Sequence, residues 1–199
     1  MPARTARRLT LSPTTQASVR RFDDRVDRAF DHLRGNPVAD RVFYGASALG
    51  DHSLIWVMLA AARGLRSGSS DGGLHLRAAV RAVAGLGVES ALVNQGIKNL
   101  FRRSRPLATT PRPLSLRKPR SSSFPSGHAT SAFCAAGLLA DGDPAFAPAY
   151  YAIATIVAAS RIHVRIHHAS DVVAGIPIGI ALGWVGRRLH PLPPVRRSS

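Results

Sequence analysis

The chain has 199 residues, 45% of them apolar, and its formal net charge is +16 at pH 7. This length predicts one domain with a tail at each end, and the apolar content is ordinary for a folded chain. The single cysteine, Cys134, excludes an internal disulfide. The large positive charge favours an anionic partner, which is either nucleic acid or a membrane surface.

Residues 1–41 form a basic N-terminal segment with nine arginines before any apolar run, so no cleavable signal is expected. Within this segment, residues 18–34 place apolar side chains at helical spacing, with Arg and Asp between them. The pattern predicts an amphipathic helix, for which two positions are open. The helix lies on the membrane surface with its arginines toward anionic headgroups, or it packs against the rest of the protein.

Five apolar stretches follow, at residues 42–62, 82–97, 129–140, 145–160 and 172–186. Small residues are frequent in them, which suits close helix contacts in lipid, and the last stretch contains no charged side chain. We predict an all-α fold, an integral membrane helical bundle over 42–188 with about five transmembrane helices, followed by a basic, Pro-rich tail over 189–199. Several stretches are shorter than the roughly 20 residues that cross a bilayer unaided, so a soluble bundle is the alternative.

Ionisable side chains interrupt the first two apolar stretches: Asp51 and His52 in the first, Glu89 in the second. A charge at membrane depth needs a partner or a wet cavity. Glu89 precedes Lys98 by nine residues, which turns the two to opposite faces of a helix, so Glu89 is left out of the candidate site. Residues 107–123 are rich in Pro, Ser and Arg and predict a loop, which either caps a pocket or is simply solvated.

Three short strings bring together fixed positive charge, imidazoles and hydroxyls. They are Lys98-x6-Arg105-Pro106, Pro125-Ser126-Gly127-His128 and Ser160-Arg161-x5-His167-x3-Asp171. In a phosphoryl transfer, charge on the non-bridging oxygens must be met by fixed donors. Lys98, Arg105 and Arg161 would supply an ammonium and two guanidinium forks, and Ser126 and the Gly127 amide would add neutral donors. The strings therefore predict a pocket for one phosphoryl group.

The spacing of the histidines separates their roles. His167 and Asp171 are four residues apart, so on a helical turn the carboxylate can hold one ring nitrogen protonated and leave the other free to attack phosphorus. His128 follows a Pro-Ser-Gly turn near an expected helix start and is the better general acid. His163 and His167 are also four apart, but no Glu follows His163 and no Cys or carboxylate cluster is near, so we predict no metal site.

The ordered strings resemble the signature of the type-2 phosphatidic acid phosphatase family, which includes vanadium haloperoxidases and bacterial class A acid phosphatases. All eleven specified positions of the family pattern are filled between Lys98 and Asp171. The resemblance covers about the last half of the chain. It implies a helical bundle and a reaction through a phosphohistidine without metal or other cofactor. In that reaction His167 would be the nucleophile, Asp171 its orienting partner and His128 the acid/base, and the remaining five residues would hold phosphate.

These observations predict a multi-pass cell-membrane phosphatase that hydrolyses a phosphate monoester or diphosphate of a lipid. The candidate substrates are phosphatidic acid, phosphatidylglycerophosphate and prenyl phosphates or diphosphates, including a phosphorylated prenyl-linked sugar. One alternative is a vanadate-dependent haloperoxidase, because vanadate mimics the phosphate transition state. The other is a basic nucleic-acid-binding protein, which would stay soluble without detergent and bind less tightly in salt; we expect no nucleic-acid partner.

The orientation in the membrane depends on whether 42–62 crosses it. If it does, the N-terminal segment and the three strings share one face, which then holds 19 of the 27 Lys and Arg residues. The positive-inside rule makes that face cytoplasmic. If 42–62 does not cross, the N-terminal segment moves to the other face and the site points outward.

Overall fold

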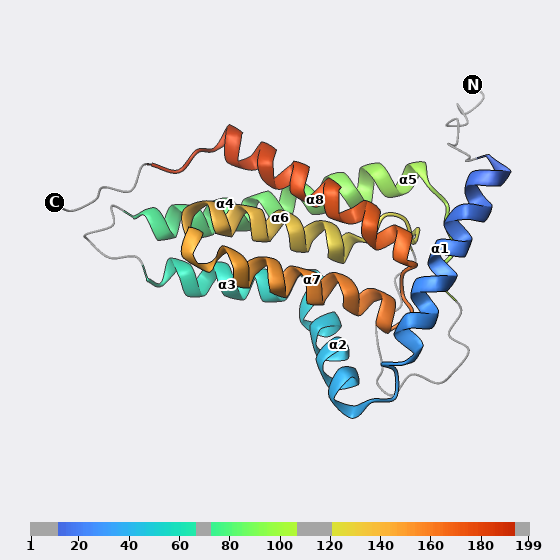
Figure 1. Ribbon diagram of the computed structural model, residues 1–199. Helices are drawn as coiled ribbons and strands as arrows, with labels where there is room; N and C mark the ends of the chain where they lie inside the picture. Colours follow the sequence, from blue (N-terminus) through green and yellow to red (C-terminus); the bar gives the residue numbers. More distant parts are fainter. Residues whose placement is uncertain (1–11, 67–72, 107–120, 194–199) are drawn as a thin grey trace, which may run out of the picture.

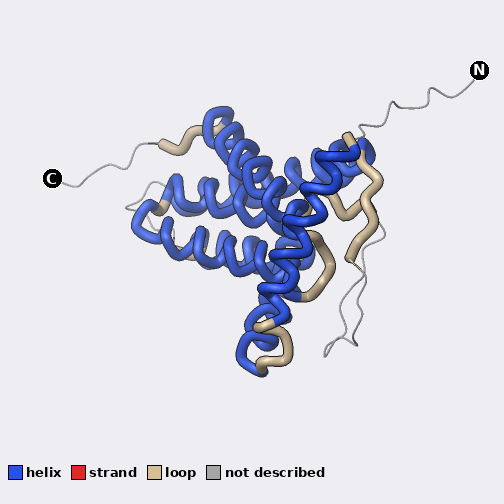
Figure 2. Tube along the Cα trace, turned by 45° about the vertical axis from the view of Figure 1, so that its right-hand side comes forward, coloured by secondary structure: helices blue, strands red, loops and turns tan. Residues whose placement is uncertain are grey.

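The computed structural model describes residues 12–66, 73–106 and 121–193, and these residues form helices and loops without a strand (Figure 2). In chain order the segments are α1 (Pro13–Asp31), α2 (Pro37–Gly50), the single turn η1 (Asp51–Ser53), α3 (Leu54–Gly64), α4 (Leu74–Ala91), the wide turn η3 (Leu92–Ile97), α5 (Lys98–Leu100), α6 (Gly127–Gly142), the turn η4 (Pro144–Phe146), α7 (Ala147–His163) and α8 (Ala169–Leu189). The predicted all-α fold is confirmed for this part of the chain.

Five of the helices run along one another in a bundle, and α1 and α2 cross one end of it (Figure 1). The bundle consists of α3, α4, α6, α7 and α8, and α6 packs against the other four. Most side chains of α6 are buried on every side, and many are small, such as Ala132, Ala135 and Ala136. A helix that is apolar all round must be enclosed, so α6 forms the centre of the protein.

Glycines bring α8 close to α6. A side-chain carbon at Gly175 would lie 2.9 Å from the carbonyl oxygen of Ser126, and one at Gly179 would collide with the carbonyl of Thr130. The small residues noted in the sequence therefore allow direct backbone contact between the two helices. This contact holds the start of α8 against the start of α6, where two of the three motif strings lie.

The stretch at 42–62, whose crossing of the membrane the sequence leaves open, is not one helix. Helix α2 ends at Gly50 and α3 begins at Leu54, because His52 and Ser53 adopt left-handed backbone angles with φ of 52° and 59°. Helix α2 packs on α7 across the end of the bundle, and only α3 runs along the bundle axis (Figure 1). The two halves of this stretch therefore point in different directions, and the average hydropathy of the sequence does not show the break.

Two described segments are long and apolar enough to cross a membrane, Pro144–His163 and Ala169–Leu189. They correspond to the predicted stretches at 145–160 and 172–186. The stretch at 129–140 lies inside α6, and the stretch at 82–97 continues from α4 into η3. The figure of about five transmembrane helices stays a prediction.

The amphipathic helix α1 packs against the bundle, which is the second of its two predicted positions. Val26 and Phe30 contact a buried cluster that contains Ile162 and Val172. Asp23 is buried and accepts a hydrogen bond of 2.8 Å from the backbone N–H of Ser170 at the start of α8. Of the predicted loop and tail, residues 107–120 and 194–199 lie outside the described part of the chain.

Candidate active site

The three motif strings meet at the end of the bundle that α1 and α2 cross, which we call the motif end. Helix α4 leads through η3 to Lys98, and α6 begins at Gly127. Arg161 lies in the last turn of α7, His167 in the connection to α8, and Asp171 in the first turn of α8. The fold thus gathers residues that are up to 73 positions apart in the sequence into one region.

His167 lies beside Asp171, as the four-residue spacing predicts. Its Nδ1 is 3.6 Å from the Oδ2 of Asp171 and 3.4 Å from the hydroxyl oxygen of Ser123. Asp171 is fully buried, and its carboxylate accepts hydrogen bonds from the Ser123 hydroxyl (2.5 Å), the His168 backbone N–H (2.9 Å) and Arg103 (2.6 Å). These donors hold the carboxylate in one orientation against the ring.

The other ring nitrogen of His167 faces Arg105. The guanidinium Nη1 of Arg105 lies 3.1 Å from Nε2, and the same guanidinium donates to the backbone carbonyls of Ile166, Ser121 and Ser122. A guanidinium has only donors, so Nε2 accepts this bond with its lone pair. The proton of a neutral His167 is then on Nδ1, on the side of Asp171.

The pKa of His167 is lowered to about 3, mainly by burial and also by the charges of Arg105 and Arg161, while Asp171 opposes the shift. An unburied histidine has a pKa of about 6.5. Between these values the folded protein keeps His167 neutral while the unfolded chain binds a proton. Lowering the pH through this window therefore destabilises the folded state, and above about 6.5 the effect is absent.

We expect the melting temperature of the purified protein to fall as the pH is lowered from 7 to 5, and to fall less in His167→Gln. One group of this kind changes the free energy of unfolding by about 1.4 kcal/mol per pH unit, or about 3 °C in a protein of this size. The measurement is thermal unfolding in detergent at several pH values. The exposed His32→Gln is the matched control and should keep the wild-type slope; equal slopes in all three proteins would contradict the expectation.

Lys98 and Gly127 lie together. The Lys98 side chain is buried, its Nζ donates to the side-chain oxygen of Asn94 at 2.9 Å, and a side-chain carbon at Gly127 would lie 3.3 Å from that Nζ. The glycine therefore lets the ammonium approach the first turn of α6. Ser126 is also buried, and its hydroxyl oxygen caps α6 by accepting from the N–H of Ala129. Its hydroxyl proton is not used by the cap.

Arg161 is buried at the end of α7 and donates to the hydroxyl of Ser47 in α2. Its charge acts on both His128 and His167. The guanidinium therefore lies near both imidazoles that the sequence singles out. All eight predicted site residues are thus found at the motif end: Lys98, Arg105, Ser126, Gly127, His128, Arg161, His167 and Asp171.

His128 is held by the short connection between α2 and α3. Its Nε2 is 3.2 Å from the Oδ1 of Asp51 and 3.3 Å from the backbone carbonyl of Ser47. Gly50 packs directly on the imidazole, since a side-chain carbon there would lie 2.6 Å from the ring Cδ2. The break between α2 and α3 therefore has a role, because it places a carboxylate and a glycine against His128.

Gly50→Ala is expected to displace His128 and to reduce phosphate release by about tenfold or more, since a small misplacement of an acid/base group is enough to slow proton transfer. Gly45→Ala is the matched control, because nothing lies within 4 Å of its added carbon. Initial rates and membrane content of the two variants should be compared. Equal rates would show that the ring tolerates the extra methyl group.

His163 lies apart from this group. Its Nε2 is 2.7 Å from the Oδ1 of Asp40, and its ring stacks on Phe43 with centroids 4.6 Å apart. In the described part of the chain, no group of three or more His, Cys, Asp or Glu is arranged to hold a metal ion. His163 thus connects α7 to α2.

Four residues that contact the candidate site residues were not predicted from the sequence to belong to the site: Ser47, Asp51, Arg103 and Ser123. Asp51 had a signal, since it is an ionisable group in an apolar stretch and needs a partner. Arg103 lies inside the first motif string between Lys98 and Arg105, but no spacing rule distinguishes it from Arg102. Serine is a common residue, so nothing in the sequence separates Ser47 of α2 and Ser123 from the other serines.

Comparison with known proteins agrees with this arrangement. The model of the PAP2 superfamily matches residues 78–192. A decaprenylphosphoryl-5-phosphoribose phosphatase of Mycolicibacterium smegmatis is 38% identical over 146 residues, which are 72% of this chain and 74% of that protein. The corresponding Mycobacterium tuberculosis protein is 33% identical over 71% of this chain and 75% of its own length. A lipid A 1-phosphatase of Porphyromonas gingivalis is 34% identical over 51% of this chain and 21% of its own length.

Among solved structures, a transmembrane PAP2-type phosphatidylglycerolphosphate phosphatase from Bacillus subtilis superposes with a TM-score of 0.62 over 86% of each chain. At 24% sequence identity this likeness shows the fold. The two candidate spans, together with relatives that are named as phosphatases of lipids, indicate a membrane location. The predicted class, a phosphatase of phosphorylated lipids, is confirmed at the level of the family. Because the PAP2 model matches residues 78–192 and a phosphatase relative is 38% identical over 72% of this chain, the chain belongs to the PAP2 superfamily.

Proposed function

We propose that this protein removes a terminal phosphate from a lipid through a phosphohistidine on His167, without a metal ion. The substrate class that we favour is a phosphorylated prenyl-linked sugar. Two relatives that match over more than two thirds of this chain are named for such a compound. The observation that carries the proposal is the pairing of His167 with Asp171 on one side of the ring and Arg105 on the other.

Three cationic side chains, those of Lys98, Arg105 and Arg161, bind the phosphate. In the structure Arg105 donates to the Nε2 lone pair that must attack phosphorus. The oxygens of a phosphoryl group placed between Arg105 and His167 would accept the hydrogen bonds of the guanidinium. Nε2 would then face the phosphorus atom. Lys98 beside Gly127 and Arg161 beside Ser47 would meet the remaining oxygens, so the charge that develops in the transition state is opposed by fixed donors.

In the first chemical step, Nε2 of His167 forms a bond to phosphorus while the bond from phosphorus to the lipid oxygen breaks. The ring becomes positively charged, and Asp171 stabilises that charge through Nδ1. Arg103, Ser123 and the His168 N–H keep the carboxylate in place while this happens. Without these donors the carboxylate would be free to rotate away from the ring.

His128 supplies the proton that the departing lipid oxygen needs. Asp51 and the Ser47 carbonyl orient its ring through Nε2. In the second step a water molecule attacks the phosphohistidine, and His128 takes a proton from it as a base. Inorganic phosphate leaves and His167 returns to its neutral form.

The experiment is phosphate release by the purified protein in detergent with EDTA present. Substrates of matched chemistry should be compared: a polyprenylphosphoryl phosphoribose, a polyprenyl phosphate, phosphatidic acid and phosphatidylglycerophosphate. We expect the prenyl-linked sugar phosphate to have the highest kcat/KM. Activity confined to phosphatidic acid or phosphatidylglycerophosphate would overturn the substrate class. No hydrolysis, with halide oxidation on adding vanadate, would overturn the phosphatase function.

We further propose that the motif end faces the cytoplasm. Among the described residues, twelve Lys and Arg belong to the segments at this end and six to those at the other. The packing of α1 and α2 on the motif end supports this count, because it keeps the basic N-terminal segment on the same side as the strings. The proposed orientation does not require residues 42–62 to cross the membrane as one helix.

Labelling of single cysteines in intact cells tests the orientation. In a Cys134→Ala background, Ser121→Cys marks the motif end and Leu65→Cys the opposite end, and both positions are exposed. A membrane-impermeant maleimide should label position 65 in intact cells and position 121 only after permeabilisation. The reverse pattern would place the site outside.

A further inference from the structure

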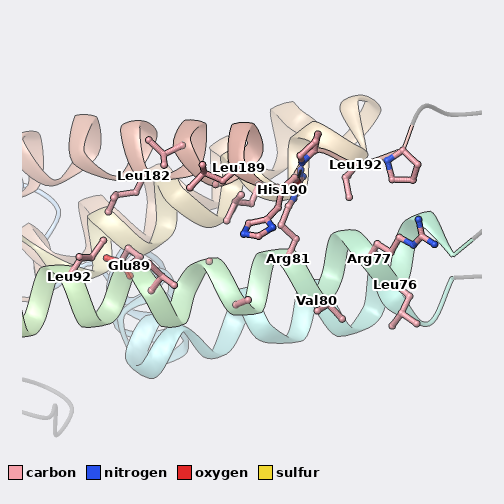
Figure 3. Close-up of a pocket in the computed structure, with 18 residues that line it drawn as sticks. Leu76, Arg77, Val80, Arg81, Glu89, Leu92, Leu182, Leu189, His190 and Leu192 are labelled. Carbon is pink, nitrogen blue, oxygen red and sulfur yellow. Dashed lines mark hydrogen bonds between the residues drawn. The ribbon is translucent and has the colours of Figure 1, made fainter.

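A cavity lies along α4 and the second half of α8 and extends to the end of the bundle remote from the motif strings. Between α4 and α8, over α6, the structure leaves a groove of about 710 Å³ with almost wholly apolar walls (Figure 3). Val80 and Ala84 of α4, Leu182 and Val185 of α8 and Leu138 of α6 line it. None of the eight predicted site residues does. We call this cavity the distal groove.

The distal groove is long, since it follows nearly the whole of α4 but only the second half of α8. Along α4 and into the first residue of η3 its lining extends from Leu76 to Leu92, which at 1.5 Å per residue is about 24 Å. On α8 the lining begins only at Leu182, about three turns after Asp171. A groove of this length and polarity suits a hydrocarbon chain that enters from the leaflet opposite the site.

The remote end of the groove is basic. Arg77, Arg81 and His190 line it there, and Figure 3 shows the Arg81 and His190 side chains next to each other between α4 and the end of α8. Arg77 is exposed and forms no ion pair with any described residue. Arg81 donates to the His190 carbonyl at 3.1 Å and pairs with Asp141 at 2.8 Å, while its Nε has no partner among the described residues.

The charges around this mouth favour an anion. Two arginines approach a single carboxylate, since Arg81 and Arg187 lie 2.8 Å and 3.9 Å from Asp141, and Arg77 adds a further positive charge to the lining. Trp184 lies one turn from this level with Arg188 stacked on its ring at 5.3 Å, which is the arrangement of an aromatic side chain at a membrane interface. An apolar groove that ends in a cationic mouth at interface depth matches the two parts of an anionic phospholipid.

We propose that the distal groove binds one anionic phospholipid from the leaflet opposite the active site. An acyl chain lies along α4 and α8, and the phosphate lies at Arg77, Arg81 and His190. This lipid is distinct from the substrate, whose phosphate belongs at the other end of the bundle. Because α4 leads to Lys98 and α8 begins beside His167, a chain seated between the two helices also braces the elements that carry the site.

The test is binding of defined lipids to the purified protein, measured by native mass spectrometry and by the melting temperature. The probes are a phosphatidylglycerol and a phosphatidylcholine with the same acyl chains. We expect phosphatidylglycerol to bind at least fivefold more tightly and to raise the melting temperature, with one lipid per chain at saturation. Equal binding of the two lipids would overturn the anionic assignment.

Variants locate the site. Ala84→Trp, at an exposed groove position, should abolish the tight binding by filling the groove. Arg77→Gln should weaken it about fivefold, the loss expected for one headgroup contact. Arg66→Gln is the matched control, since Arg66 pairs with Asp143 and does not line the groove. Unchanged binding in Ala84→Trp, or an equal loss in Arg66→Gln, would overturn the proposal.

The same measurement in His167→Gln separates this inference from the proposed function. That variant should bind phosphatidylglycerol as the wild type does, because its change is at the motif end. If the enzyme proves inactive on every lipid phosphate while the lipid still binds, only the proposed function fails. If lipid binding is lost in the variant, the bound molecule belongs to the active site and the distal assignment fails.

Discussion

Replacing His167 with glutamine is expected to reduce phosphate release by at least about 10⁴-fold, because removal of a covalent nucleophile eliminates the pathway. Glutamine can still accept a hydrogen bond from Arg105 and is close to the size of the imidazole, so the pocket should remain assembled. The measurement is steady-state phosphate release together with trapping of a labelled phosphoenzyme by alkaline quench from a ³²P-labelled lipid. Label should accumulate on the wild type and be absent from the variant.

His168→Gln is the matched control for this experiment. It changes the neighbouring histidine, whose ring contacts the Ser104 carbonyl at 3.3 Å, and it keeps the backbone N–H of residue 168 that donates to the Asp171 carboxylate. Its rate should stay within about tenfold of the wild type. Wild-type turnover in His167→Gln, or label retained on it, would remove His167 from the reaction.

Arg161→Lys is expected to lower kcat by about 10²–10³-fold, the scale seen when one donor to a developing oxyanion is lost. Arg161 is almost fully buried and already directs one end of its guanidinium to the Ser47 hydroxyl. A guanidinium can keep that bond and still present further N–H groups to a phosphate, whereas an ammonium is a single point of charge. The substitution therefore keeps the charge and removes the fork.

The comparison for Arg161→Lys is Arg165→Lys, four residues later in the same connection. Arg165 forms ion pairs with Asp27 and Asp31 of α1, and a lysine can replace much of such a contact. Both variants should be assayed for kcat and KM, with membrane content checked by immunoblot. A kcat near that of the wild type in Arg161→Lys would assign the residue to holding α7 against α2.

The all-α fold and the meeting of the candidate site residues at one end of the bundle could both be predicted from the sequence, because each depends on local patterns. The eight site residues occur in strings whose spacing within each string is short, so the sequence displays them directly. Their meeting at one end of the bundle follows once 129–140, 145–160 and 172–186 are taken as consecutive antiparallel helices, since this puts the start of α6, the end of α7 and the start of α8 together.

Contacts between distant segments could not be predicted in this way. Asp51 supports His128 only because two residues with left-handed backbone angles turn the chain between α2 and α3. The hydropathy of 42–62 is that of one continuous helix, and neither His52 nor Ser53 belongs to the residue types that mark such a break reliably. Arg103 reaches Asp171 across 68 positions of sequence, a separation at which spacing rules carry no information.

Arg103 also has a consequence for the role of the first helix. One end of its guanidinium bonds Asp171, and the other bonds Asp23 in α1 at 2.5 Å. The side chain of Arg103 thus links the N-terminal helix to Asp171, the carboxylate that orients the proposed nucleophile His167. Removal of residues before 32 would take away Asp23, so one end of the Arg103 guanidinium would lose its partner and Asp171 would be less firmly oriented. The shortened enzyme should therefore turn over more slowly even where its bundle folds.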